Sequence, residues 1–134
     1  MIRFLTISYF RNRIESLLKI KRGVYKNVCS EISREFNAKS IEEIRNNRDM
    51  ILLTDDDIVI KLRLPDKKQR LSKKDGYRLI YLVSKISETV VFLDIYPKNG
   101  PSQQLDISDN DLARMLELFA DEEQRHTLIE YEIQ

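Results

Sequence analysis

Residues 61–98 read KLRLPDKKQRLSKKDGYRLIYLVSKISETVVFLDIYPK, in which hydrophobic segments typical of strands enclose a dense basic loop. Only Asp66 and Asp75 are acidic between positions 61 and 78, so this stretch has a net charge of +6. Its eight basic residues are Lys61, Arg63, Lys67, Lys68, Arg70, Lys73, Lys74 and Arg78. Such a patch predicts a polyanionic binding partner.

Four segments around this loop predict the strands of a sheet. Residues 50–53 and 58–64 are strand-like and flank a Thr-Asp-Asp-Asp segment, which predicts a hairpin because Asp tolerates turn conformations. Segments 77–83 and 90–96 are hydrophobic throughout, as is typical of central strands that are covered on both faces. We therefore expect these segments to form an antiparallel sheet.

Helical spacing of hydrophobic residues predicts helices over residues 10–18, over 24–37 and from Ser108 onward. Residues 3–8 predict a short first strand, and the capping-box pair in Ser40–Arg45 predicts one further helical turn. We expect the first two helices to form an antiparallel hairpin. The predicted fold class is α+β, with this N-terminal helical hairpin packed on one side of an antiparallel sheet and with a C-terminal helix.

The length of 134 residues fits a single domain, with a core over about residues 5–120 and an acidic extension over 121–134. Its one cysteine, Cys29, lies among apolar positions of a predicted helix, which favours a buried free thiol over a nucleophile. Residues 1–8 are too short for a signal peptide, and no apolar run reaches the ~20 residues of a membrane span. We expect a cytoplasmic protein with no membrane partner, and the sequence leaves its oligomeric state open.

The C-terminal part of the chain is acidic. Residues 79–134 contain four basic and eleven acidic side chains. One interpretation is that residues 121–134 lie across the basic surface and screen it; the other is that the acidic residues only solvate the last helix. From Ala120 onward the chain either continues that helix or docks elsewhere through Leu128, Tyr131 and Ile133.

Several familiar catalytic sites lack their components. His126 is the only histidine and lies in the acidic tail, so histidine-based triads and metal sites are not expected. The glycines are isolated, which excludes a phosphate-binding loop. Asp55, Asp56 and Asp57 are adjacent and lack the spacing of a calcium loop. We predict no metal and no cofactor.

What remains is a group of cations and one phenol on the sheet. Strand alternation places Lys61 and Arg63 on one face of their strand, and Tyr96 and Lys98 on one face of the last strand. Arg78 begins the strand between them. Arg78 and Arg63 suit the stabilisation of a phosphorane, and Tyr96 or Lys98 suits proton transfer if the cations lower its pKa.

The loop cations predict a nucleic-acid contact rather than catalysis. The candidate RNA-binding residues are Lys67, Lys68, Arg70, Lys73 and Lys74. The alternative interpretation is structural: Lys61, Arg63 and Arg78 would be ordinary strand residues that pair with Asp66 and Asp94. The tyrosines Tyr77, Tyr81 and Tyr96 would then be core or rim aromatics.

The order of these segments resembles the RelE/HigB family of bacterial toxins, within the RelE/ParE superfamily, over about residues 5–120. The pieces GYRLIYLV and LDIYPKNG are the most specific. The resemblance implies the small α+β fold of microbial ribonucleases and the cleavage of messenger RNA, usually on the ribosome. It also implies an antitoxin protein as partner, and matches Arg78, Lys61 and Lys98 to basic site residues of the family.

The sequence departs from the RelE pattern at two positions. Val59 and Asn99 stand where that branch has a lysine and an arginine, and the terminal catalytic tyrosine has no clear counterpart. These departures bring the chain closer to the HigB-like branch. Two alternatives to an endoribonuclease are a non-enzymatic inhibitor of DNA gyrase, like ParE proteins, and an inactive protein-binding module of the same fold.

Overall fold

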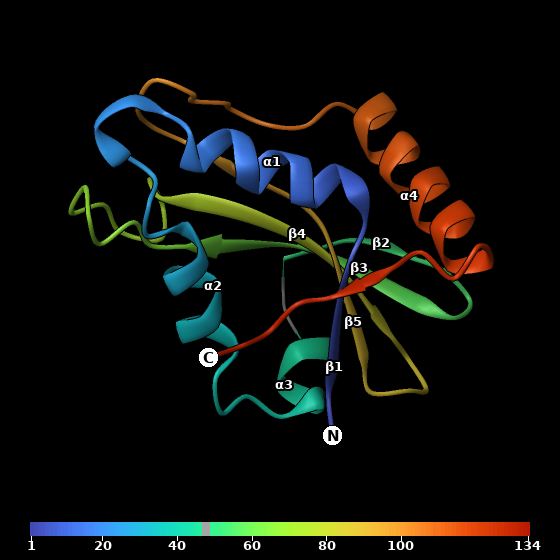
Figure 1. The fold of residues 1–134 in the computed structure, drawn as a ribbon. Helices are drawn as coiled ribbons and strands as arrows, with labels where there is room; N and C mark the ends of the chain where they lie inside the picture. Colours follow the sequence, from blue (N-terminus) through green and yellow to red (C-terminus); the bar gives the residue numbers. More distant parts are fainter. Residues whose placement is uncertain (47–48) are drawn as a thin grey trace.

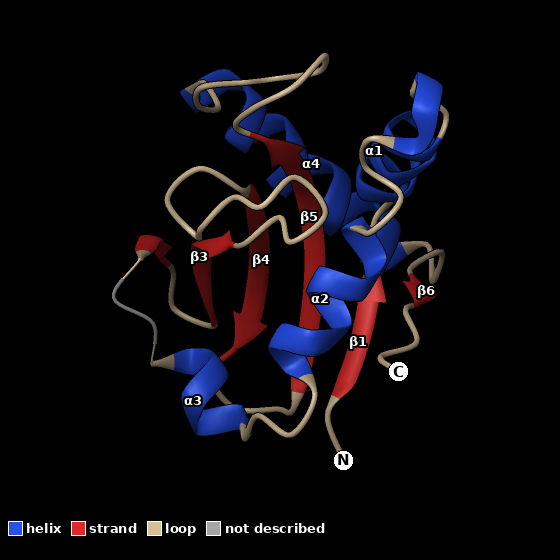
Figure 2. Ribbon diagram, turned by 90° about the vertical axis from the view of Figure 1, so that its left-hand side faces the viewer, coloured by secondary structure: helices blue, strands red, loops and turns tan. Residues whose placement is uncertain are grey.

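The computed structural model of the chain describes residues 1–46 and 49–134. Its centre is a six-stranded sheet in the order β2-β3-β4-β5-β1-β6 (Figures 1 and 2). The strands are β1 (Arg3–Thr6), β2 (Met50–Leu53), β3 (Asp57–Leu64), β4 (Tyr77–Ser84), β5 (Thr89–Pro97) and β6 (Ile129–Glu130). The helices are α1 (Ser8–Leu18), the 3-10 turn η1 (Lys21–Gly23), α2 (Val28–Phe36), α3 (Ile41–Arg45) and α4 (Asp109–Gln124). The predicted α+β class is confirmed.

Local sequence signals account for several element boundaries. Ser40 and Ser108 each accept a hydrogen bond from the third residue of the helix that follows, in the capping boxes that open α3 and α4. Thr54 N–H donates to the carbonyl oxygen of Asp57 at 2.9 Å and closes the expected β2–β3 hairpin. Cys29 lies in α2, as expected, but is half-buried rather than fully buried.

One strand of the sheet has a parallel neighbour. β1 pairs in parallel with the first half of β5, from Thr89 to Phe92, whereas the other neighbouring strands pair in antiparallel fashion. The four segments expected to form an antiparallel sheet do so, and β1 adds a parallel pair that the sequence did not indicate. The sequence of a short hydrophobic strand does not reveal whether it pairs in parallel or antiparallel fashion, because its side chains alternate with the same period in both cases.

β5 contains a bulge, which changes the face of the sheet to which its later side chains point. Tyr81 of β4 pairs with Phe92, and its neighbour Ile80 pairs with Asp94, so Leu93 is an extra residue in β5. Adjacent residues of β4 point to opposite faces. Phe92 therefore faces the same side of the sheet as Tyr81. Asp94 and Tyr96 face the opposite side, together with their partners Ile80 and Arg78.

Helices cover both faces of the sheet, not one as we expected. Phe36 of α2 packs on Phe92 and Tyr81 on one face, where the Tyr81 hydroxyl also donates to the Ile44 carbonyl of α3 at 2.8 Å. On the opposite face Phe119 of α4 lines a cavity with Leu82 of β4. Figure 2 shows α2 in front of the sheet and α4 behind it. This agrees with the continuous hydrophobicity of β4 and β5.

α1 lies along the edge of β5 where β1 has ended. Thr6, the last residue of β1, pairs with Phe92. Beyond it Phe10 packs on Phe92, with ring centroids 5.4 Å apart, and Arg13 pairs with Asp94 at 3.1 Å. α1 therefore contacts both faces of β5, whereas α2 covers one face. Figure 1 shows α2 turned away from α1 and not folded back alongside it, so the expected antiparallel hairpin is not formed.

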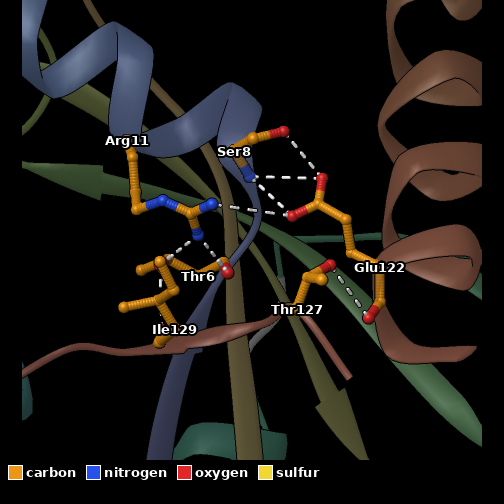
Figure 3. Close-up of polar contacts among 6 residues, drawn as sticks. All are labelled: Thr6, Ser8, Arg11, Glu122, Thr127 and Ile129. Carbon is orange, nitrogen blue, oxygen red and sulfur yellow. Dashed lines mark hydrogen bonds and ion pairs between the residues drawn. The ribbon is translucent and has the colours of Figure 1, made fainter. Parts of the chain in front are cut away.

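A buried carboxylate ties α4 to the start of α1 (Figure 3). Glu122 accepts hydrogen bonds from the backbone N–H of Ser8 at 2.9 Å and from its hydroxyl at 2.7 Å. It lies 3.7 Å from the guanidinium of Arg11. The preceding residue, Ile7, offers no side-chain acceptor, so Glu122 supplies the negative cap that this helix start lacks.

The C-terminal segment docks on the sheet. β6 pairs with β1, and the ring of Tyr131 packs against Phe10 and Phe92. The packed interior thus continues beyond Ala120. In the sheet order β4, β5 and β1 separate β6 from β3, so this segment does not lie across the basic loop as one interpretation required. None of the helices in the described residues is long and apolar enough to cross a membrane.

Candidate functional site

The five predicted site residues on the sheet line one cavity of about 400 Å³. Lys61 and Arg63 come from β3, Arg78 begins β4, Tyr96 lies near the end of β5, and Lys98 follows that strand. The remaining lining residues are Asp49, Met50, Ile51, Leu105 and Asp106. Three of the five form a row across the sheet, because Arg63 pairs with Arg78 and Arg78 with Tyr96. Strand register therefore brings together residues that are 33 positions apart in the sequence.

Arg78 is a fixed part of the cavity wall. Only 7% of its surface is exposed. Its guanidinium donates to the carbonyl oxygens of Lys73 at 2.9 Å, Lys74 at 2.7 Å and Tyr77 at 3.1 Å. Burial, and then the charge of Arg63, lower its pKa from the ordinary value, although an arginine stays protonated near neutral pH. Arg78 thus holds the base of the basic loop as well as facing the cavity.

Arg63 differs from its neighbour in being available for a ligand. Its side chain is exposed and, within residues 1–46 and 49–134, has no hydrogen-bond or ion-pair partner. It pairs in register with Arg78, and its charge is close enough to lower the pKa of Arg78. A bound anion with oxygens placed for the planar guanidinium fork would relieve their mutual repulsion.

The two lysines of the cavity each contact the segment between β5 and α4. Lys61 Nζ donates to Asp106 Oδ1 at 2.9 Å, and Lys98 Nζ donates to the backbone carbonyl of Leu105 at 2.8 Å. The hydrogen bonds from Lys61 and from the N–H of Ile107 lower the pKa of Asp106, which is therefore a carboxylate at neutral pH.

Tyr96 is a buried phenol without a satisfied hydroxyl. Its side chain is 0% exposed, and among the described residues its oxygen makes no hydrogen bond of ordinary geometry. Burial, and then the nearby Asp106 carboxylate, raise the pKa of Tyr96 above its ordinary value. We expected the cations to lower this pKa. The hydroxyl is consequently a hydrogen-bond donor at neutral pH and not a base.

The five loop cations are all exposed, and no ion pair engages them in the described part of the chain. They are Lys67, Lys68, Arg70, Lys73 and Lys74. Two buried carboxylates fix the root of their loop. Glu31 accepts the N–H of Lys67 at 2.6 Å, and Asp66 accepts the side-chain amides of Asn27 at 3.0 Å and Gln69 at 2.7 Å.

The structural alternative for the sheet cations required pairs with Asp66 and Asp94. The first carboxylate instead binds Asn27 and Gln69, and the second pairs with Arg13. Neither pair is formed, so the cations of the cavity are not neutralised in that way.

The two positions where the chain departs from the RelE pattern lie outside the cavity lining. Val59 is fully buried in the core. The side-chain amide of Asn99 donates to the Asp75 carbonyl at 2.7 Å, which ties the end of β5 to the loop before β4. Both residues therefore have structural roles here.

Sequence reasoning missed Asp106, the residue that contacts Lys61. It lies 45 positions further along the chain, in a segment without helical or strand periodicity. Its only signal is a negative charge shortly before the capping box of α4, which does not indicate a contact with β3. Within the described residues no group of three or more His, Cys, Asp or Glu side chains is gathered as a metal site.

The cavity can hold a phosphate-sized anion. Its lining contains the guanidinium groups of Arg63 and Arg78, two ammonium groups, a phenol hydroxyl and the carboxylates of Asp49 and Asp106, so its cations outnumber its acidic groups by two. Comparison of the chain with protein-family models, with curated proteins and with solved structures finds no match.

Proposed function

We propose that this protein is an endoribonuclease that cuts messenger RNA, and that it is the toxin of a bacterial type II toxin–antitoxin pair. The observation that carries the proposal is the row of Arg63, Arg78 and Tyr96 across three strands, with Lys61 and Lys98 beside it. The proposed substrate is ribosome-bound mRNA in the cytoplasm. The fold is then a RelE-like, microbial-ribonuclease-like variant, with α1 along the edge of the sheet and β6 as an additional strand.

The proposed reaction is attack by the ribose 2′-oxygen on the adjacent phosphorus. The bond from phosphorus to the 5′-oxygen breaks, leaving a 2′,3′-cyclic phosphate and a 5′-hydroxyl. Arg63 and Arg78 stabilise the charge of the phosphorane, because preorganised cations in a partly dry site stabilise a charged transition state strongly.

Proton transfer divides between the remaining groups. Tyr96 is protonated and buried, so it donates a hydrogen bond to a phosphate or leaving oxygen. Lys98, when unprotonated, is the candidate for accepting the 2′-proton, and it then delivers this proton to the leaving 5′-oxygen as the bond to phosphorus breaks. No step of this reaction uses a metal or a cofactor.

The exposed loop supports binding of a long substrate. The backbone carbonyls of Lys73 and Lys74 bind the Arg78 guanidinium, so the end of the basic loop joins the cavity wall. Phosphate contacts of this kind position RNA or a ribosomal surface without reading bases. A cognate antitoxin would inhibit the protein by covering the same basic groove.

One observation favours a non-enzymatic alternative. The raised pKa of Tyr96 removes one of the two candidate bases, and a cavity without a base binds anions but does not cleave RNA. In that case the protein inhibits DNA gyrase as ParE proteins do, or serves as an inactive protein-binding module of the RelE fold.

Induced expression of the chain, with growth measurement and mapping of RNA 5′ ends, tests the proposal. The endoribonuclease arrests growth and produces new 5′ ends inside coding regions, and Arg63→Ala produces neither. Gyrase-dependent DNA damage without new RNA ends would favour the ParE-like alternative. Harmless expression of folded protein would favour the inactive module.

A further inference from the structure

The segment that joins β5 to α4 occupies both ammonium groups of the cavity. Figure 1 shows it as the orange trace that runs from the end of β5 to α4. Two consecutive residues supply the oxygens: the carbonyl of Leu105 binds Lys98 Nζ at 2.8 Å, and the carboxylate of Asp106 binds Lys61 Nζ at 2.9 Å. In the free protein, neither lysine presents an unoccupied ammonium group.

This segment is anchored firmly at its start. The Tyr25 hydroxyl donates to the Asn99 carbonyl at 2.8 Å and accepts the N–H of Ser102 at 3.0 Å. Gly100 has φ +95°, and a Cβ there would lie 2.5 Å from the Tyr25 hydroxyl oxygen, so the close approach requires glycine. Gln104 N–H donates to the Pro97 carbonyl at 2.9 Å.

The middle of the segment is more exposed, although Ile107 packs against the core and the Gln104 side-chain amide donates to the Asp106 carbonyl at 3.0 Å. Leu105 is 74% exposed and the side chain of Asp106 is 63% exposed. An ion pair this exposed contributes little to stability, so another anion replaces it at little cost. At Ser108 the chain is fixed again by the capping box of α4. Residues 105–107 thus form a short strap between two anchored points.

The cavity also contains two hydrogen-bond donors that have no acceptor of ordinary geometry in the part of the chain that the structure describes. The hydroxyl of Tyr96 is buried without a hydrogen bond of ordinary geometry, and Arg63 has no partner among the described residues. The Asp106 carboxylate at Lys61 lies near the Tyr96 hydroxyl and raises its pKa, but it makes no hydrogen bond of ordinary geometry with that hydroxyl and does not bind Arg63. A phosphodiester has the same charge but carries its oxygens on a tetrahedral centre, so it can engage one of these groups in addition to Lys61.

We propose that the Asp106 carboxylate marks the phosphate subsite of the cavity, and that residues 105–107 are a strap which the backbone phosphate of a nucleic acid displaces. This inference rests on the proposed function, whose substrate supplies that phosphate. In the empty cavity the strap neutralises Lys61 and accepts a hydrogen bond from Lys98. It also lowers the affinity for short or weakly held anions, because each must replace Asp106 before it reaches Lys61.

Binding of a short fluorescein-labelled oligodeoxyribonucleotide, which lacks the 2′-hydroxyl and is not cleaved by the proposed reaction, tests the strap. Asp106→Asn should tighten its binding to the full chain several-fold at low salt, with a factor that shrinks as salt screens the charges. The matched control is Asp55→Asn, an equal change of charge in the exposed β2–β3 turn, which should leave the affinity unchanged. Equal affinities of Asp106→Asn and the wild type would overturn the strap.

Backbone NMR of the wild-type chain separates displacement from a general charge effect. On titration with the same oligodeoxyribonucleotide, the amides of Leu105, Asp106 and Ile107 should shift with the same midpoint as that of Arg63. Signals of the strap that stay in place while Arg63 shifts would overturn the strap and leave the proposed function standing. Binding that Lys61→Ala does not weaken would instead overturn the cavity as the nucleic-acid site, and the strap with it.

Discussion

Arg78 Nη2 donates a 2.7 Å hydrogen bond to the backbone carbonyl of Lys74, which joins the strongest catalytic candidate to the loop expected to bind RNA. Arg78 is buried, although it lies at the start of a strand. Its burial and its three carbonyl partners give it a structural role as well.

The first prediction follows from this double role. Arg78→Ala should lower the free energy of unfolding by roughly 1–3 kcal/mol, because three carbonyl groups lose a charged donor. It should also lower the cleavage rate at least about 100-fold, since the guanidinium faces the developing charge. Urea denaturation and a cleavage assay under folding conditions measure the two effects.

Arg63 provides the control for that prediction. It is exposed and unpaired in the described residues, so Arg63→Ala should change stability by less than about 0.5 kcal/mol while still abolishing cleavage. Full activity of a folded Arg63→Ala protein would remove this residue from the site.

The second prediction concerns the basic loop. Replacement of Lys67, Lys68, Lys73 and Lys74 by Ala should weaken RNA binding and reduce the dependence of log affinity on log salt by up to about 0.7 per lost contact. Replacement of the same four residues by Arg retains the charges and should retain the salt dependence. An unchanged slope in the Ala variant would show that the loop is only a solvated connection.

The third prediction concerns the unsatisfied hydroxyl of Tyr96. Tyr96→Phe should leave the protein as stable as the wild type or slightly more stable, because it removes a buried polar atom without a hydrogen bond. Cleavage should nevertheless fall by about 10-fold or more if the hydroxyl donates to the substrate. The raised pKa also predicts that pH–rate profiles of the two proteins run parallel between pH 6 and about 9. Loss of an acidic or basic limb in the variant would contradict this assignment.

The fourth prediction uses the buried carboxylate of Asp94. Burial raises its pKa to about 6, although the ion pair with Arg13 opposes the shift. Because the folded pKa lies above the unfolded value of about 3.9, the native state binds the proton more tightly. The contribution of this group to stability is therefore full below about pH 4 and is lost as the pH rises through 6.

Asp94→Asn should flatten this part of the stability profile. The wild type should lose up to about 3 kcal/mol of unfolding free energy from this group between pH 4 and pH 7, and the variant should lose less. Thermal or urea denaturation across that range provides the measurement. Identical profiles for the two proteins would mean that Asp94 titrates as an ordinary surface carboxylate.

The sequence predicted those parts of the fold that depend on local pattern. Alternation in β3 placed Lys61 and Arg63 on one face, and the turn before β4 placed Arg78 at a strand start. Because β3, β4 and β5 follow one another and pair in order, local pattern sufficed to bring the cations and Tyr96 into one cavity. The capping boxes of α3 and α4 were equally local signals.

Features that depend on distant contacts were not predictable in this way. The parallel direction of β1 and the pairing of β6 join the two ends of the chain, and nothing in either segment specifies its partner. Asp106 reaches Lys61 from an aperiodic segment. The bulge at Leu93 was also unforeseen, since β5 is hydrophobic on both faces and its pattern does not reveal a change of face.

The end groups of RNA fragments, made by the purified protein on ribosomes programmed with a defined mRNA, test the central claim most directly. Attack by the 2′-oxygen in the cavity of Arg63, Arg78 and Tyr96 predicts fragments with a 2′,3′-cyclic phosphate or its 3′-phosphate product, and with a 5′-hydroxyl. These fragments should be absent with Arg63→Ala. Fragments with 3′-hydroxyl and 5′-phosphate ends, or RNA left intact by the folded wild-type protein, would contradict the account.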